Sequence, residues 1–509
     1  MNIVARNWRM LVSAAFTVGV FLFWFLGYYM WLAYHEEMQM FRWSWDYFVN
    51  DISISGGFAD WLGEFVVQFY YVLWLGSLLL ALLSLAAQRV TYLLIKDFTT
   101  SDSPWLFAAS FAVPVILILL MGDISVMLSF PIAVTLALLA AWLMNKPTKI
   151  CRHSIWMDIV VLPVVFWLLG GGASWFYVAI RLAFAIKHSR IWLYAVMLLY
   201  LFGVQSLAKN TIMSQWPEKS VYLGVRYYYI PFQYVGGIWG FDSQLRELLT
   251  LDYLVRHERW KDIIERADKY QNYDAFSCNC INLALSQERQ LADRMFEFYQ
   301  TGEDALLMER VRDNMSNYPT MEAFWRLGLI NSCLRYSSDL QESIMSTQKS
   351  GRLTKRIAEC HIVNKNYKLA QKHLNLLKQT LFYRRWALET EELMKHSVRV
   401  NGHPVYGKLR RYRMKDDKLI FWYPEKDKIL GQLFISNTDN KMALDYFIGE
   451  LMLKCDLQNF MRYLGWAQKY GGYPVMPRGY LDAAQCIKAR GNVGNSPYKE
   501  YVNRVKGEK

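Results

Sequence analysis

The sequence predicts an all-α protein in two parts, a polytopic transmembrane helical domain followed by an α-solenoid that carries a small β-hairpin insertion. Charge is distributed unevenly along the 509 residues. Residues 1–208 hold 11 basic and 10 acidic residues, about 10% of that segment, whereas residues 209–509 hold 46 and 34, about 27%. Long uncharged stretches occur in the first part, and helical periodicity dominates the second. A disordered chain, a small disulfide scaffold and a purely cytosolic enzyme are thereby excluded.

Seven segments of the first part are predicted as membrane spans, because a spanning helix needs about 20 apolar residues. They lie near residues 10–33, 65–88, 104–121, 124–144, 155–170, 173–187 and 191–208. Gly170-Gly171-Gly172 either forms a turn between two short helices or lies within one long helix, which would leave six spans. The short length of the two halves favours six spans. The basic residues of the loops favour seven, since Lys and Arg stay on the cytoplasmic side.

We predict seven spans in a multi-pass protein of a bacterial inner membrane, with the second part of the chain in the periplasm. Six spans would place that part in the cytoplasm. Residues 209–241, which include Tyr227-Tyr228-Tyr229, are predicted as an aromatic connector at the membrane interface, where tyrosine rings lie at headgroup level. Membrane lipid is therefore an expected partner.

Residues 242–397 are predicted to form helical repeats. Two stretches show the same design, in which an aromatic residue opens the second helix of a pair and a small alanine follows on the same face. Trp260 and Ala267 occupy these positions in one stretch, and Tyr367 and Ala370 in the other. The alanine allows close helix approach, and the aromatic ring fills the space between pairs. The units resemble degenerate tetratricopeptide repeats without a strict period.

The remaining segments are an insertion, further helices and a tail. Residues 398–436 alternate apolar and polar side chains around Lys415-Asp416-Asp417-Lys418, which predicts a β-hairpin. Helices are expected over residues 437–490, with Asn440 as a helix cap. Residues 491–509 are expected to be loosely ordered.

Four basic residues of the insertion, Lys408, Arg410, Arg411 and Arg413, are candidates for contact with anionic lipid or an acidic partner protein. A solvated hairpin face is the simpler alternative. Nucleic acid is not an expected partner.

The first outer loop holds the acidic residues Glu36, Glu37 and Asp46 in an aromatic stretch. Membrane glycosyltransferases that use lipid-linked sugars carry an acidic catalytic residue in this loop, as a general base or a ligand of a divalent cation. An amphipathic interfacial helix with solvated acids is the alternative. Arg181 is expected to reach the membrane surface along its own stem, with Asp158 as the alternative partner.

The rest of the chain shows no motif of a familiar enzyme. It contains no Walker loop, no GxGxxG after a strand, no GxSxG and no HExxH. No His/Cys spacing suits zinc. We therefore expect no cofactor and no metal, apart from a cation under the glycosyltransferase hypothesis.

Several short stretches resemble an uncharacterised family of polytopic inner-membrane proteins from Bacteroidetes. They are Asn440-Lys441-Met442-Ala443-Leu444-Asp445-Tyr446, Asp456-Leu457, the run from Pro477 to Ala484, Asp252-Tyr253-Leu254-Val255-Arg256, and Trp260 with Ile263-Ile264. The resemblance implies an N-terminal membrane domain, a C-terminal tetratricopeptide-like region and an envelope location, but no catalytic residues.

The function expected from the sequence is that of a membrane protein presenting a helical-repeat domain for protein–protein interaction or scaffolding in the cell envelope. The alternative is a membrane-embedded, glycosyltransferase-like enzyme that acts on a lipid-linked substrate through the first outer loop.

Overall fold

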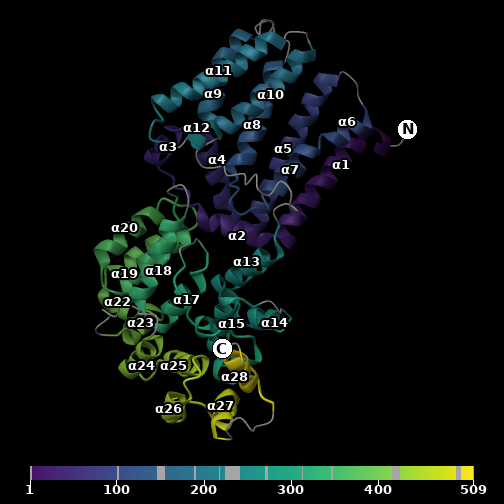
Figure 1. The fold of residues 1–509 in the computed structure, drawn as a ribbon. Coiled ribbons are helices and arrows are strands. Elements are labelled where there is room, and N and C mark those ends of the chain that lie inside the picture. The colour runs from purple at the N-terminus through teal and green to yellow at the C-terminus, as the bar shows by residue number, and fades with distance from the viewer. Residues whose placement is uncertain are drawn as a thin grey trace. The chain divides into compact units, whose positions relative to one another are not determined.

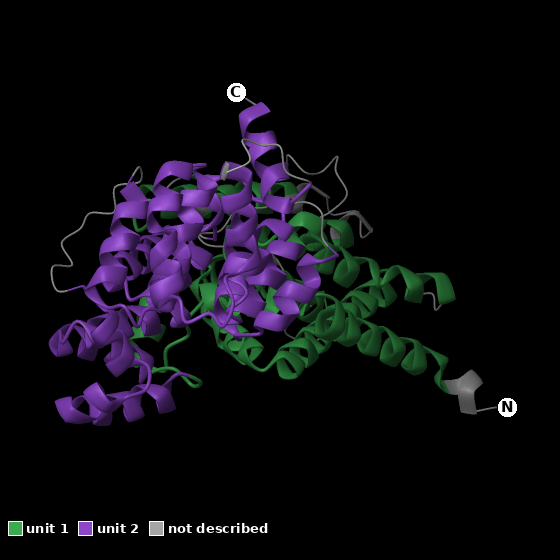
Figure 2. Ribbon diagram, turned by 90° about the horizontal axis from the view of Figure 1, so that it is seen from below, with its two compact units in different colours: residues 1–246, 345–348, 379–382 green, residues 247–344, 349–378, 383–509 purple. Residues whose placement is uncertain are grey.

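The chain is divided into two compact units, which Figure 2 shows in different colours. The computed structural model describes residues 3–99, 103–145, 155–187, 191–216, 218–223, 241–269, 273–311, 313, 315–344, 348–414, 425–488 and 495–507. Unit 1 comprises residues 1–246, 345–348 and 379–382, and unit 2 comprises residues 247–344, 349–378 and 383–509. All regular elements of the described residues are helices (Figure 1).

Unit 1 is built from mostly apolar helices. In chain order its elements are α1 (Ile3–Leu22), the π-helix η1 (Phe23–Gly27), α2 (Tyr29–Met38), α3 (Trp45–Ile52), α4 (Gly57–Val67), the 3-10 helix η2 (Gln68–Tyr71), α5 (Leu73–Thr99), α6 (Pro104–Ala109), α7 (Ala112–Leu120), α8 (Ser129–Asn145), α9 (Ile155–Leu169), α10 (Gly171–Lys187), α11 (Ile191–Asn210) and α12 (Glu218–Leu223). Helix α8 packs against α4, α5 and α10. It is buried along most of its length and forms the centre of the unit.

Two helical stretches of the described residues, Asn7–Gly27 and Leu73–Thr99, are long and apolar enough to cross a membrane. Three other apolar stretches, Pro104–Leu120, Ser129–Asn145 and Met157–Leu169, fall within 10–17 residues, too short for a straight crossing. The prediction of about seven spans is therefore wrong. An uncharged stretch overstates helix length where regular helix is interrupted inside it, as between the end of α6 at Ala109 and the start of α7 at Ala112.

The three-glycine segment contains one such interruption. Gly170 adopts a left-handed conformation with φ 91° between α9 and α10, which pack against each other. A Cβ atom on Gly171 would meet the backbone carbonyl oxygens of Val221 and Tyr222, so α12 approaches closely here. The segment therefore forms two short helices. In the predicted connector, 209–241, the residues 224–240 lie outside the described part of the chain.

Unit 2 contains a longer series of short helices. They are α13 (Ser243–Arg256), α14 (Trp260–Ala267), α15 (Ala275–Gln287), α16 (Leu291–Arg294), the 3-10 helices η5 (Met295–Glu297) and η6 (Glu303–Ala305), α17 (Tyr318–Leu327), α18 (Ile330–Ser343), α19 (Gly351–Val363), α20 (Tyr367–Leu377), α21 (Arg384–Met394), α22 (Ser397–Gly402), α23 (Tyr406–Tyr412), α24 (Lys426–Ser436), α25 (Lys441–Leu453), α26 (Leu457–Tyr470), α27 (Arg478–Lys488) and α28 (Pro497–Gly507). Each helix from α17 to α21 packs on the next.

Five helix pairs of unit 2 share one turn geometry. The pairs are α13–α14, α15–α16, α17–α18, α19–α20 and α25–α26. Each turn holds one residue with positive φ, and these are Glu258 (55°), Arg289 (59°), Gly328 (89°), Lys365 (62°) and Cys455 (52°). In each turn the next residue donates its backbone N–H to the carbonyl five residues earlier, over 2.7–2.9 Å. This is the Schellman arrangement, which satisfies carbonyls at a helix end.

The predicted β-hairpin over residues 398–436 is wrong. The described part of this segment forms α22, α23 and α24, and residues 415–424 lie outside the described residues. Leu409 and Tyr406 are buried three residues apart, which is helical spacing. A Cβ atom on Gly407 would meet the Asn401 carbonyl, so this glycine permits α22 and α23 to pack closely.

The C-terminal region is anchored by helices. Asn440 accepts a hydrogen bond from the Ala443 backbone N–H at 3.2 Å, which confirms the predicted cap of α25. Part of the segment 491–509, expected to be loosely ordered, forms α28. The hydroxyls of Tyr498 and Tyr501 are buried and donate to the carbonyls of Met452 and Leu453 at 3.2 and 2.7 Å. These contacts hold α28 against the end of α25.

Candidate functional site

A groove of about 370 Å³ opens in unit 2 where helix ends converge. Its lining comes from the end of α15, the end of α17, α23 with the residues before it, and the start of α25. Four cations line it, Arg289, Arg326, Lys408 and Lys441, together with one acid, Asp439. The groove is therefore basic, and its volume falls within the ~300–1,000 Å³ of ligand pockets.

Glycine at position 328 brings two walls of the groove together. Gly328 ends α17 with φ 89°, and a Cβ atom there would lie 2.9 Å from the Cβ of Tyr412. Both the turn and the close approach require glycine. The Tyr412 hydroxyl donates to the Asp439 carbonyl at 3.3 Å, which joins α23 to the segment before α25.

Asn440 fixes the opposite wall. Its side chain is fully buried, and its amide nitrogen donates to the Leu327 carbonyl at 2.8 Å. Because its oxygen caps α25, one side chain joins the end of α17 to the start of α25. This wall of the groove is thus held by buried hydrogen bonds.

Two donors at the groove remain without a hydrogen-bond partner among the described residues. One is the hydroxyl of Ser286, whose residue is 4% exposed, and the other is Nε of Arg326. The Nη2 of the same Arg326 donates to Glu258 at 2.8 Å, and the guanidinium lies 4.7 Å from the ring centre of Trp260. Buried donors without partners cost free energy, so each of them marks a place where an acceptor would be stabilised.

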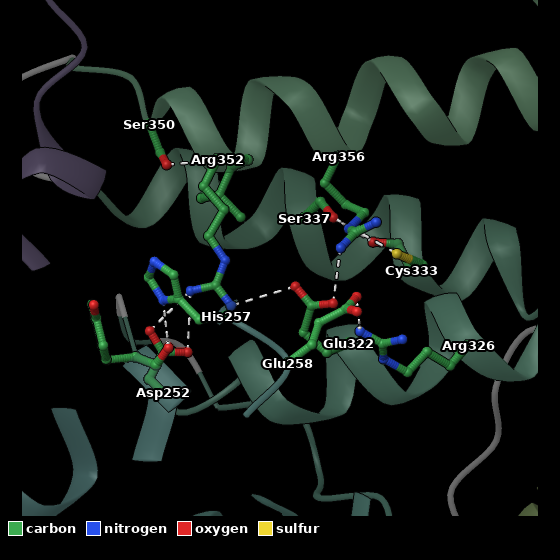
Figure 3. Close-up of polar contacts among 12 residues, drawn as sticks. Asp252, His257, Glu258, Glu322, Arg326, Cys333, Ser337, Ser350, Arg352 and Arg356 are labelled. Carbon is green, nitrogen blue, oxygen red and sulfur yellow. Dashed lines mark hydrogen bonds and ion pairs between the residues drawn. The ribbon is translucent and has the colours of Figure 1, made fainter. Parts of the chain in front are cut away.

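An ion network beside the groove connects three helices (Figure 3). Arg352 of α19 contacts Asp252 of α13 at 2.9 Å and Glu322 of α17 at 3.3 Å. Arg356 contacts the same Glu322 at 2.8 Å and Glu359 at 2.9 Å. All five side chains are at most 15% exposed. Removal of one partner would leave an uncompensated buried charge, so the network fixes how α13, α17 and α19 pack.

Glu322 is the centre of this network. Burial by itself raises the pKa of its carboxyl, but Arg356, Arg352 and Arg326 together outweigh burial and lower the pKa to about 2. Arg326 lines the groove and also contacts Glu258, so the groove and the network share this residue. The carboxylate therefore stays ionised at neutral pH and holds the arginines in place.

The four predicted basic contact residues have different surroundings. Lys408 and Arg411 are exposed, and Lys408 lines the groove. Arg410 instead donates to the carbonyls of Ile362 and Val363 at 2.6 and 3.3 Å, at the end of α19. Arg413 donates to the side-chain oxygen of Asn364 at 2.7 Å. Two members of the run therefore serve internal packing.

The four predicted repeat residues lie at helix junctions. Ala267 and Ala370 are buried, at 3% and 0% exposure. Tyr367 is half-buried and its hydroxyl accepts a hydrogen bond from Arg410 at 2.9 Å. Trp260 is half-buried beneath Arg326. The aromatic residues thus hold arginines as well as filling space.

The acidic residues of the predicted outer loop do not gather into an exposed site. Glu36 and Glu37 are buried on α2, whereas Asp46 is exposed in the first turn of α3. His35 is buried too, and burial, partly offset by Asp123, lowers its pKa to about 4, so it is neutral. Within the described residues no group of three or more His, Cys, Asp and Glu could hold a metal ion.

Arg181 does not reach the surface. Its side chain is 3% exposed and its Nη2 lies 2.7 Å from Asp158 of α9. The hydroxyl of Tyr177 donates to the same carboxylate at 2.5 Å, and the guanidinium also donates to the Met144 carbonyl at 3.2 Å. The expected extension of Arg181 to the membrane surface is therefore wrong. The pair with Asp158 is satisfied locally between α8, α9 and α10.

Sequence reasoning missed most of the groove and all of the network. Asp252 and Arg352 are 100 residues apart, and no motif connects them. The sequence does contain a weak signal, because Asp252 and Glu322 lie among the apolar residues on the buried faces of α13 and α17. An acid on such a stripe requires a buried partner.

The chain was compared with protein families, curated proteins and solved structures. The model of a family of unknown function, DUF6057, matches residues 5–503. The chain belongs to this family. The expected membership in an uncharacterised family is thus confirmed for nearly the whole chain. Neither a curated protein nor a solved structure matches the chain significantly.

Proposed function

We propose that this DUF6057 protein is a membrane-anchored scaffold, whose unit 2 is a tetratricopeptide-like helical-repeat domain that binds a partner protein. The observation that carries the proposal is the turn shared by five helix pairs, because repetition of one helix–turn–helix unit is the basis of helical-repeat binding domains. The basic groove supplies a concave surface for that partner.

The exterior of unit 1 supports membrane anchoring. Most of the exposed large hydrophobic side chains among the described residues belong to this unit, including Val18, Leu22 and Leu26 on the first apolar stretch. Together with Asn7–Gly27 and Leu73–Thr99, they offer lipid an apolar surface. We infer attachment to the inner membrane of a bacterium, in keeping with the resemblance to proteins of Bacteroidetes.

The proposal is tested in cells with the full-length chain. In one variant a photo-crosslinking amino acid replaces Val405, which lines the groove and is 44% exposed. In the matched control it replaces Val475, which is 76% exposed and lies outside the groove. We expect the protein in carbonate-washed membranes and a discrete crosslinked protein from position 405 only. A chain released by carbonate, or equal crosslinking at both positions, would contradict the proposal.

A further inference from the structure

We propose that the groove is a carboxylate-binding site that takes an acidic peptide segment of the partner, rich in Asp and Glu. The inference rests on the proposed function, because it names the chemistry of the partner that unit 2 would bind. It is carried by the two donors at the groove that lack partners, Ser286 Oγ and Arg326 Nε, and by the surplus of cations around them.

The two donors define the chemical group. A hydroxyl and a guanidinium N–H both donate hydrogen bonds, so their complement is an acceptor. A carboxylate accepts several hydrogen bonds and carries the charge that Arg326 prefers. Arg326 is already oriented by Glu258 and Trp260, so little side-chain freedom is lost when the carboxylate binds.

The cations define the sign of the ligand. Arg289 and Lys408 are both exposed and flank the same groove as Lys441, with Asp439 as the acid among its lining residues. Arg289 lies 3.9 Å from Asp445, which leaves its guanidinium, 54% exposed, able to contact a second acidic side chain. A segment with several acids satisfies more of these cations than a single carboxylate does.

The walls favour a peptide over a free anion or a nucleic acid. Val405, Leu409 and Met442 add apolar surface beside Trp325 and Tyr412, which suits the side chains and backbone of a peptide. A nucleic acid requires a track of cations along its phosphates. Arg410 and Arg413 interrupt any such track, because they donate to the end of α19 and to Asn364.

The test uses the full-length protein in nanodiscs of zwitterionic lipid and a fluorescein-labelled Glu-Gly repeat peptide with an amidated C-terminus. Fluorescence anisotropy should show saturable binding that weakens as salt rises. The same peptide with Gln for Glu should bind at least about 10-fold more weakly, since hydrogen bonds to charged groups are the stronger class.

Ser286→Ala separates binding from folding. It removes a buried hydroxyl that has no partner among the described residues, so thermal stability should be unchanged or slightly higher. Peptide affinity should fall about 10-fold. Lys408→Gln should weaken binding by about 3-fold. Arg411→Gln is the matched control, because Arg411 is exposed on the same helix but does not line the groove, and it should bind as the wild type does.

Equal binding of the Glu and Gln peptides would overturn the inference, and so would an unchanged affinity of Ser286→Ala. A third contrary result would be displacement of the labelled Glu peptide by phosphatidylglycerol vesicles whose headgroup concentration equals that at which the unlabelled Glu-Gly peptide competes. If crosslinking from position 405 still captures a protein, the scaffold proposal stands and the acidic partner chemistry alone fails. If crosslinking is absent as well, both proposals fail.

Discussion

The two units differ in how they accommodate buried charge. Unit 1 exposes Val18, Leu22 and Leu26 and buries Asp158 with Arg181. Unit 2 carries most of the charge of the chain on a series of short helices, and it joins five charges that are at most 15% exposed in one connected network. Among the described residues of unit 1, Asp158 has one ion-pair partner, Arg181, whereas in unit 2 Glu322 contacts both Arg352 and Arg356. Burial of charge is therefore tolerated in both units for different reasons.

Breaking the pair of Asp158 and Arg181 should have the largest effect. Arg181→Met removes the ion-pair partner of the buried Asp158 between α9 and α10, which should destabilise unit 1 by about 3–5 kcal/mol. Thermal unfolding of the full chain in detergent, followed by tryptophan fluorescence, measures the loss. The double variant Arg181→Met with Asp158→Leu should recover most of it. A double variant as unstable as the single one would contradict this explanation.

A charge on the apolar exterior tests which unit contacts lipid. Val18→Lys puts a cation near the middle of the stretch Asn7–Gly27, where insertion scales assign lysine a cost of about 2.5–3.5 kcal/mol. We expect a measurable share of the variant to be lost from carbonate-washed membranes. Val398→Lys, at a residue of unit 2 that is 80% exposed, should leave membrane association unchanged. Equal losses from both variants would remove the contrast between the units.

The network of unit 2 should make stability depend on acid. The folded-state pKa of Glu322 is lowered to about 2, below the value of 4.5 for an unperturbed carboxyl, so its contribution is present above pH 4.5 and is lost as the pH falls toward 2. The magnitude is about 3 kcal/mol. Glu322→Gln should lower stability at pH 7 and flatten the pH dependence in denaturant titrations. Glu265→Gln, at an exposed side chain of α14, is the control and should change neither.

Substitution at one of the shared turns should have the smallest effect on the stability of unit 2, and it should increase that stability. Lys365 adopts φ 62°, a conformation that costs an L-residue about 1 kcal/mol and glycine little. Lys365→Gly should therefore stabilise unit 2 by about 0.5–1 kcal/mol. Lys368→Gly, inside the neighbouring helix α20, should destabilise by about 1 kcal/mol. Chemical denaturation of both variants measures the difference, and a loss of stability in Lys365→Gly would argue against strain at this turn.

The sequence predicted the helical class and the capping role of Asn440, because both depend on local patterns. The predictions from sequence were wrong where one local pattern is compatible with two different structures. The uncharged stretch near 104–121 is divided between α6 and α7. The alternating residues around Leu409 form α23 rather than a strand, and Gly407 allows α23 to pack closely against α22. Periodicity over a few residues does not separate helix from strand.

The candidate site was less predictable than the fold. Lys408 was singled out from its basic run, but its neighbours Arg410 and Arg413 contact the end of α19 and Asn364, which only the folded chain reveals. Ser286 and Arg326 carry no signal in the sequence, since their importance comes from the absence of hydrogen-bond partners among the described residues. Long-range contacts of this kind require either the structure or an alignment of related chains.

The ion pair between Arg352 and Asp252 affects how the chain folds during its synthesis. Ribosomes add about 5–20 residues per second. Synthesis of the 100 residues that separate the two partners therefore takes roughly 5–20 s, and during this time Asp252 has been made but Arg352 has not. Helix α13 cannot bury its acid favourably in that interval, so the N-terminal end of unit 2 should close only after α19 has emerged. Newly made chains would therefore expose the apolar stripe of α13 to solvent for those seconds.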